Sequence, residues 1–388
     1  MPGEPGEGTR PRVIGTAWGD PRSVRTYSGV PAPLFAELER TGSLVATADA
    51  DLTRRSDVLR GLVDWRRSFE ARRPRRSAVW RYLPENIELL SRRFASVERS
   101  LPAHDSVLQF GVGGVPDDEV VLVSHVEIPV RTAVTTDVFA RSYGFDRLAD
   151  PVIERAIEGE RWFLERSALV WTNTPWTAEL LAADGVEPGR LRVFPPACAG
   201  TDPGEIQRDW DGLRILFIGK DWERKGGSLL LEAFRLVLRS RPDATLTIIG
   251  CSPPVREPGV RVLGFLDRDR PGDATVLHEE MAAATVFCMP SYWESTGLVY
   301  LEAALYGLPL VMLAGQGREH VFPSDMAIHL DEGSVDDLAD ALVDLGADGG
   351  RAAALGRAGR QRVLADHTLP AVAARVASWL GEARDCSS

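Results

Sequence analysis

Short apolar runs recur along the whole chain, and most of them are followed by a longer amphipathic stretch. A run of roughly four to six apolar residues suits a strand that is buried on both faces, as in a parallel sheet. Stretches such as 228–240 and 335–345 have the spacing of amphipathic helices. This alternation predicts an α/β protein with doubly wound sheets. The apolar runs are 13–15, 106–110, 120–124, 169–171, 214–218, 245–249, 286–289 and 308–312.

The alternation is interrupted near the middle of the chain. The stretch A-G-T-D-P-G is polar and rich in turn-forming residues, and a new strand opens at Arg214. We therefore expect two Rossmann-like domains facing each other across a ligand cleft. The predicted parts are a disordered arm at 1–10, an acceptor-binding domain at 11–200, a linker at 201–211, a donor-binding domain at 212–370, and a C-terminal helix at 371–388 that could pack back on the first domain.

Length and composition agree with this division. The chain has 388 residues, more than one core usually organises. Its net charge of -11 argues against a general nucleic-acid binder. The four cysteines form no C-x-x-C pair, which gives neither a common zinc spacing nor a disulfide framework. No apolar run approaches the roughly 20 residues of a membrane span, and the start lacks a signal-peptide core, so we predict a cytoplasmic protein.

One candidate for chemistry is F-I-G-K-D-W-E-R-K-G-G-S, residues 217–228. An apolar strand ends at Gly219, two lysines follow at Lys220 and Lys225, and a helix opens near Gly227. Backbone N–H groups at a helix start and two ammonium groups form an anion site, most naturally for phosphates. The spacing is not that of a Walker A loop. A solvated turn with ordinary surface charges is the alternative.

The second candidate is P-S-Y-W-E-S-T-G-L-V-Y-L-E, residues 290–302. Glu294 precedes a turn of small residues, and Glu302 falls on the second turn of the helix that follows. A carboxylate accepts hydrogen bonds from two vicinal hydroxyls, and helix-start amides bind hydroxyls or phosphate oxygens. Two acids and two lysines therefore suit a sugar–nucleotide diphosphate. The alternative is a surface cap followed by a charge on a helix face.

Taken in order and at their spacing, the two segments resemble the donor half of a retaining glycosyltransferase of family 4. These enzymes are glycosyl transferases group 1 and have the GT-B fold. The family's G-R-x-x-x-x-K-G motif is matched by Gly219, Lys220, Lys225 and Gly226, and its E-x(7)-E motif by the two glutamates. The intervening R-P-D-A-T-L-T-I-I-G and V-L-G-F-L also agree. The resemblance covers the second half of the chain.

The resemblance implies a role in donor binding for each of these residues. Glu302 should hold the ribose hydroxyls, and Lys220 and Lys225 the diphosphate. Lys220 stands where the family more often has arginine, so the charge is kept but the two-pronged grip is lost. Glu294 should contact the transferred sugar. Further donor-binding positions are Gly219, the amides of Ser295, Thr296, Gly297 and Leu298, and the nucleobase positions Gly264 and Phe265.

The first half of the chain matches the family more loosely. T-Y-S-G-V-P, residues 26–31, resembles the family's glycine loop, which comes close to the donor phosphate and the acceptor. Ser28 and Gly29 are its candidate residues, and a plain strand-to-helix turn is the alternative. His125 ends the run V-V-L-V-S-H, where the family often has a histidine near the reacting sugar. A structural histidine at a strand end is the alternative there.

By this resemblance, a hexose-type sugar moves from a UDP- or GDP-sugar to a hydroxyl acceptor with retention, by attack on the face that the leaving group occupies. A covalent intermediate on Glu294 is the other route. Cations and helix amides stabilise the charge on the departing diphosphate, so we expect no metal and no cofactor besides the sugar nucleotide. The D-x-D strings at 49–51 and 267–269 are interpreted as surface loops. Alternative functions are a sugar-nucleotide epimerase, a phosphorylase, or a catalytically inactive sugar-nucleotide-binding module.

An arginine-rich segment stands out in this acidic protein. Residues 54–93 contain twelve arginines and five acids. Three interpretations are open: a solvated helical pair, peripheral docking on anionic lipid at the inner face of a membrane, or recognition of an acidic acceptor. The acceptor is likewise open between a polysaccharide, a lipid and a small natural product.

Overall fold

The computed structural model describes residues 10–23, 26–50, 78–136, 140–141, 145–195, 197–198, 200–331 and 333–387. The chain divides into two compact units, each described here by itself. The first unit comprises Met1–Ala197 and Leu369–Ser388, and the second comprises Cys198–Thr368. The segment 201–211, predicted as a linker, lies inside the second unit. Residues 1–9 of the predicted arm and 54–77 of the arginine-rich segment lie outside the described residues.

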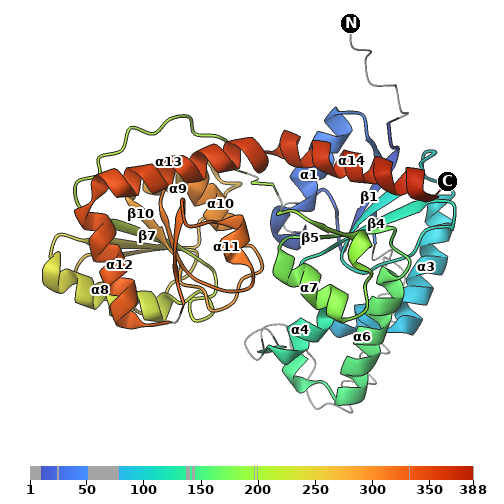
Figure 1. The fold of residues 1–388 in the computed structure, drawn as a ribbon, viewed down its shortest axis with the longest axis horizontal. Coiled ribbons are helices and arrows are strands. Elements are labelled where there is room, and N and C mark those ends of the chain that lie inside the picture. Colours follow the sequence, from blue (N-terminus) through green and yellow to red (C-terminus); the bar gives the residue numbers. More distant parts are fainter. Residues whose placement is uncertain are drawn as a thin grey trace, which may run out of the picture. The chain divides into compact units, whose positions relative to one another are not determined.

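The first unit is built on a parallel sheet of six strands (Figure 1). The strands stand in the order β2-β1-β3-β4-β5-β6, and each neighbouring pair is parallel. The central strands β3, β4 and β5 are buried along their whole length, because helices cover both faces of the sheet. The strands are β1 Val13–Ala17, β2 Leu44–Asp49, β3 Ser106–Phe110, β4 Val121–Val126, β5 Leu169–Thr172 and β6 Leu191–Val193.

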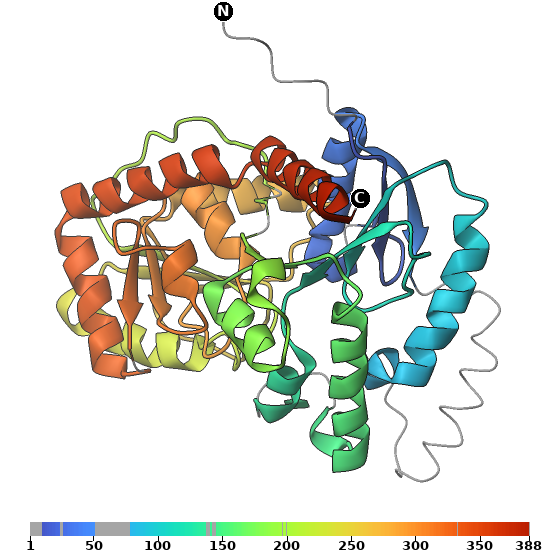
Figure 2. The same ribbon diagram turned by 45° about the vertical axis from the view of Figure 1, so that its right-hand side comes forward.

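Helices on the two faces of this sheet form two apolar cores. One core joins the sheet to α1 and α14 through residues such as Phe35 and Val376. The other joins it to α3 and α6 through residues such as Ile87 and Phe163. Helix α14 lies beside α1 and belongs to the first unit, although it follows the second unit in the sequence (Figures 1 and 2). The α-helices are α1 Pro31–Arg40, α3 Pro84–Glu98, α4 Val130–Thr135, α6 Asp150–Leu164, α7 Pro175–Ala183 and α14 Leu369–Ser387.

The second unit has the same architecture. Its six parallel strands stand in the order β12-β11-β10-β7-β8-β9. Helices α8 and α12 lie side by side, and α10 packs on α13 (Figures 1 and 2). The strands are β7 Arg214–Ile218, β8 Thr245–Ile249, β9 Val260–Gly264, β10 Val286–Cys288, β11 Leu310–Leu313 and β12 Ala327–Leu330. The helices are α8 Gly227–Ser240, α9 Pro271–Ala283, α10 Leu298–Leu305, α11 Arg318–Val321, α12 Val335–Ala347 and α13 Gly349–Asp366.

The strand orders confirm the predicted α/β class with two Rossmann-like domains. Counted within the second unit, the order is that of the dinucleotide-binding fold, and the order reverses between β7 and β10. Ligands of such sheets bind beyond the carboxyl ends of the strands at this switch point. In the first unit the corresponding reversal lies between β1 and β3. The topology therefore predicts ligand binding at the loops that follow β1, β3, β7 and β10.

Within the part of the chain that the structure describes, no helix combines the length and the hydropathy that a membrane span requires.

Candidate functional site

At the carboxyl ends of β7, β8 and β9, three glycines allow the backbones to approach each other closely. Gly219 follows β7, and its N–H donates to the Ile249 carbonyl at 2.9 Å. Gly250 has a φ of +97°, and a Cβ there would lie 2.8 Å from the Gly219 carbonyl oxygen. Its N–H donates to the carbonyl of Gly264, which also has a positive φ, at 2.7 Å. The backbone of Gly250 is thus held directly against that of Gly219 and Gly264, and Gly250 was not among the residues predicted from the sequence.

The predicted phosphate loop is fixed against the loop that follows β10. Gly226 caps α8 in the left-handed region at φ +72°, and a Cβ on it would lie 2.0 Å from the Pro290 carbonyl oxygen. Only glycine fits at this joint. The Lys225 side chain, which precedes it, is 12% exposed. The side chain of Lys225 is therefore held beside the loop that follows β10 and begins near Pro290, called the 290 loop below.

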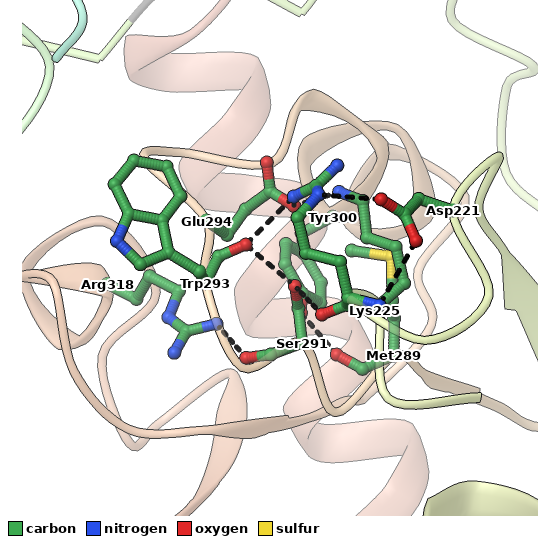
Figure 3. Close-up of polar contacts among 9 residues, drawn as sticks. Asp221, Lys225, Met289, Ser291, Trp293, Glu294, Tyr300 and Arg318 are labelled. Atoms are coloured by element: carbon green, nitrogen blue, oxygen red, sulfur yellow. Dashed lines mark hydrogen bonds and ion pairs between the residues drawn. The ribbon is translucent and has the colours of Figure 1, made fainter. Parts of the chain in front are cut away.

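Lys225 and Glu294, two of the predicted site residues, form an ion pair (Figure 3). The Glu294 side chain is 13% exposed, and the Arg224 guanidinium lies 3.5 Å from its Oε2. Arg224 also donates to the Trp293 carbonyl at 2.9 Å and lies 3.4 Å from the Asp221 carboxylate. Two cations therefore converge on one carboxylate. Arg224 was missed from the sequence, where nothing distinguishes it from a solvated loop arginine.

The loop that carries Glu294 is held by a buried arginine. The side chain of Arg318 is fully buried and donates to the carbonyl of Ser291 at 2.8 Å (Figure 3). It also donates to the carbonyls of Ala314 and Gly315, each at 2.9 Å. The Ser291 hydroxyl donates in turn to the Trp293 carbonyl at 3.0 Å. Burial lowers the pKa of Arg318. Three carbonyl acceptors satisfy its guanidinium, which joins the loops after β10 and β11.

The turn between the two glutamates is buried and closely packed. Ser295 is 2% exposed and Thr296 is 1% exposed. Gly297 caps α10 at φ +74°, and a Cβ on it would lie 2.6 Å from the Tyr300 ring. The Thr296 hydroxyl has no hydrogen-bond partner in the described protein. A buried hydroxyl of this kind suits a polar ligand group, since burying it without a partner costs free energy.

Glu302 lies on the second turn of α10, which begins at Leu298, and faces an arginine. The Arg268 Nη1 donates to Glu302 Oε1 at 2.6 Å, and Nη2 donates to Oε2. The Glu302 side chain is 11% exposed and that of Arg268 is 50% exposed. Arg268 belongs to the 267–269 string that the sequence analysis interpreted as a surface loop. The string is exposed in part, but its arginine reaches the predicted ribose-binding carboxylate.

Lys220 does not join the Lys225–Glu294 pair. Its Nζ lies over the ring of Phe265, 5.0 Å from the ring centroid. Phe265 is 60% exposed. Lys220, predicted to bind the diphosphate, therefore contacts the exposed ring of Phe265, which was predicted to lie beside the nucleobase.

In the first unit, His125 sits near the end of β4 and is 3% exposed. Its Nε2 lies 2.8 Å from the Asn173 Oδ1, so Nε2 donates and Nδ1 is left as an acceptor without a partner in the described protein. The rings of Phe110 and Trp171 lie 4.8 Å and 4.6 Å from its centroid. Burial lowers the pKa of His125 to about 4. The imidazole is therefore neutral near neutral pH and can accept a proton in a hydrogen bond, but it is a poor general acid.

The predicted glycine loop lies at the same end of the first sheet. It forms a short 3-10 helix, η1 (Thr26–Gly29), in which Gly29 has a φ of +85° and Tyr27 a φ of +46°. A Cβ on Gly111, which follows β3, would lie 1.8 Å from the Tyr27 hydroxyl, and the Gly111 N–H donates to the His125 carbonyl at 3.1 Å. Gly111 thus contacts both Tyr27 of the predicted glycine loop and the backbone of His125. The side chain of Ser28 lies outside the described residues.

Over the ranges that the structure describes, no three or more His, Cys, Asp or Glu side chains are grouped as metal ligands.

Fold and site together define a protein of two Rossmann-like units in which the second carries paired acids and cations at its switch point. Residues 212–348 match the family Glycosyl transferases group 1. The match lies within the second unit of this chain and confirms the predicted resemblance for that part.

Individual relatives agree with this assignment. A D-inositol 3-phosphate glycosyltransferase of Kribbella flavida is 29% identical over 225 residues, covering 52% of this chain and 53% of that protein. A GDP-mannose-dependent alpha-(1-6)-phosphatidylinositol monomannoside mannosyltransferase of Mycolicibacterium smegmatis is 33% identical over 177 residues, covering 42% and 46%. The chain thus aligns with about half the length of these curated relatives.

The fold extends over nearly the whole chain. The structure of a sucrose-phosphate synthase from Thermosynechococcus elongatus matches with a TM-score of 0.63 at 16% identity, covering 98% of this chain and all of that one (100%). At this identity the match concerns the fold.

Proposed function

We propose that this protein is a retaining, metal-independent glycosyltransferase that moves a hexose-type sugar from a UDP- or GDP-sugar to a hydroxyl acceptor. The observation that carries the proposal is the pairing of Glu294 with Lys225 and Arg224 at the switch point, eight residues before Glu302 in the sequence. It lies within the segment that matches the family. A relative named as GDP-mannose-dependent supports a nucleotide-sugar donor.

In this proposal the cations stabilise the departing nucleotide. Negative charge grows on the diphosphate as its bond to the anomeric carbon breaks, and fixed positive groups stabilise that charge best. Lys225 is positioned by the tight joint at Gly226. The helix-start amides of α10 add to it, since their dipoles point their positive end toward the site. Lys220 would reach the same diphosphate by leaving the Phe265 ring.

Glu294 would bind the transferred sugar rather than attack it. Its ion pair with Lys225 ties the carboxylate to the cation that serves the phosphate, so sugar and leaving group are held by one unit. The acceptor oxygen then bonds to the anomeric carbon on the face that the diphosphate leaves, and a diphosphate oxygen takes the acceptor proton. His125 stays a candidate from the sequence, and its Nδ1 has no hydrogen-bond partner among the described residues.

The test is incubation with a panel of UDP-, GDP-, ADP- and TDP-sugars while free nucleotide is followed. We expect slow nucleotide release with at least one donor, faster in the presence of an acceptor. The names of the relatives make an inositol phosphate and a phosphatidylinositol mannoside the first acceptors to try. Absence of both hydrolysis and nucleotide binding across the panel would overturn the proposal.

The variant Glu294→Gln tests the role of the carboxylate within the same assay. We expect it to abolish turnover while the wild type never forms a covalent sugar adduct detectable by mass spectrometry. An adduct on the wild type would contradict same-face attack and favour Glu294 as a nucleophile.

A further inference from the structure

Arg268 holds the carboxylate that is proposed to bind ribose. Both of its terminal nitrogens donate to Glu302, one to each oxygen, and the Nη1–Oε1 distance is 2.6 Å. Among the described residues this is its only side-chain hydrogen-bonding partner. The carboxylate belongs to a helix and is 11% exposed, whereas the arginine belongs to the loop between β9 and α9 and is 50% exposed.

A guanidinium and a vicinal diol meet a carboxylate in the same way. Each donates two roughly parallel hydrogen bonds, one to each oxygen. The Nη1–H and Nη2–H of Arg268 therefore stand in for the 2′- and 3′-hydroxyls of a ribose. The two groups compete for the same two oxygens of Glu302.

We infer that Arg268 is a built-in competitor for the ribose of the nucleotide: it must leave Glu302 for the donor to bind, and its return helps to expel the nucleoside diphosphate after transfer. This rests on the proposed function, since it takes Glu302 as the ribose ligand. The half-exposed arginine is the partner that moves, because water can take over its hydrogen bonds. The carboxylate on α10 is nearly buried and stays in place.

Only molecules in which Arg268 has left Glu302 can bind the ribose diol. The apparent affinity for the nucleotide is therefore the intrinsic affinity multiplied by the fraction of such molecules. A half-exposed ion pair is modest, so removing it should tighten ribonucleotide binding roughly three- to tenfold. A nucleotide without the diol makes no use of Glu302 and should not gain in this way. Loss of the arginine's positive charge affects both nucleotides alike and cancels in their ratio.

The experiment compares UDP and GDP with their 2′,3′-dideoxy forms by calorimetry, on the wild type and on Arg268→Gln. We expect the ratio of dideoxy to ribo dissociation constants to rise roughly three- to tenfold in the variant. Nucleotide release, followed by stopped flow, should slow accordingly. An unchanged or reduced ratio would overturn the competition and leave Arg268 as a group that merely orients Glu302.

Two further variants make the result specific. Arg261→Gln breaks a matched half-exposed pair in the same unit, in which Arg261 (59% exposed) donates to Glu280 (16% exposed) at 2.8 Å and 3.4 Å. It should leave the ratio as in the wild type, and a rise equal to that of Arg268→Gln would also overturn the inference. Glu302→Ala should bring the ratio close to one.

The same measurements separate this inference from the proposed function. A wild type that binds none of the nucleotides would sink the proposed function. If both the wild type and Arg268→Gln bind the two forms equally, Glu302 is not the ribose ligand and the competition is overturned with it.

Discussion

Single residues decide which charges of the site meet. The sequence pointed to Lys225 and Glu294, and the structure joins them although they are 69 positions apart. It did not point to Arg224 or Arg268, because an arginine in a polar loop has the same local pattern whether it is solvated or bound to an acid. The partner of Arg268 lies 34 positions away, and only the packing of α10 against the 265–270 loop selects it.

The hydroxyl of Thr296 gives a prediction at this scale. Replacing it with the isosteric valine removes a buried polar atom without a protein partner, so Thr296→Val should raise the free energy of unfolding by about 1 kcal/mol. If the hydroxyl contacts the donor, kcat/KM should fall roughly three- to tenfold in the same variant. Denaturant unfolding and steady-state kinetics give the two numbers.

The control for this change is Thr174→Val in the first unit. The Thr174 hydroxyl caps α7 by accepting from the Thr177 N–H at 3.2 Å, so its loss should destabilise the protein by about 1 kcal/mol without altering donor kinetics. An unaltered kcat/KM in Thr296→Val would take that hydroxyl out of the donor site.

At the scale of elements, the inner strands were predictable and the edge strands were not. The eight apolar runs correspond to β1, β3, β4, β5, β7, β8, β10 and β11. The four remaining strands, β2, β6, β9 and β12, are the edges of the two sheets. In β6 and β9 no residue is fully buried. An edge strand faces solvent on one side and so lacks the continuous apolar run that identifies a central strand.

The joint between α8 and the 290 loop gives a prediction for two elements together. Gly226→Ala would place a Cβ at 2.0 Å from the Pro290 carbonyl oxygen and keep a left-handed φ. We expect a loss of about 3 kcal/mol or more in the free energy of unfolding, from strain and steric overlap together. Nucleotide affinity should fall as well, because Lys225 loses its fixed position.

Gly204→Ala is the matched control, since Gly204 also lies in the second unit at a φ of +79° but has no atom within 4 Å of a Cβ. It should cost only the about 1–2 kcal/mol of the left-handed backbone. Equal losses in the two variants, measured by urea unfolding, would show that the contact with the 290 loop is unimportant.

For the whole molecule, the two units are not two consecutive halves of the sequence, because the first unit is built from segments before and after the second. The last helix, α14, comes directly after the second unit but buries Val372, Val376 and Leu380 in a core of the first. The Trp379 ring lies 6.0 Å from that of Trp171 on β5. The first unit is therefore completed by a helix that follows the second unit in the sequence.

This closure predicts that a change in α14 weakens the first unit. Leu380 is fully buried, so Leu380→Ala should lower the free energy of unfolding by about 2–5 kcal/mol. Hydrogen exchange should locate the loss in β1, β3 and β5 and leave β7 and β10 as protected as in the wild type.

An exposed leucine of the neighbouring helix serves as the reference. Leu364 on α13 is 38% exposed, and Leu364→Ala should change stability by no more than about 0.5 kcal/mol. Faster exchange in the second unit of Leu380→Ala would contradict the assignment of α14 to the first.

The sequence by itself determined the α/β class, the central strands and the positions of the two donor motifs, because these are written in local patterns: apolar runs, glycines at turns, and spacing along one helix. The tertiary structure alone decided that Arg224 supports Glu294, that Arg268 occupies Glu302, and that α14 belongs to the first unit. Those facts depend on contacts between residues far apart in the chain. Sheet topology sets such contacts, and no local pattern records them.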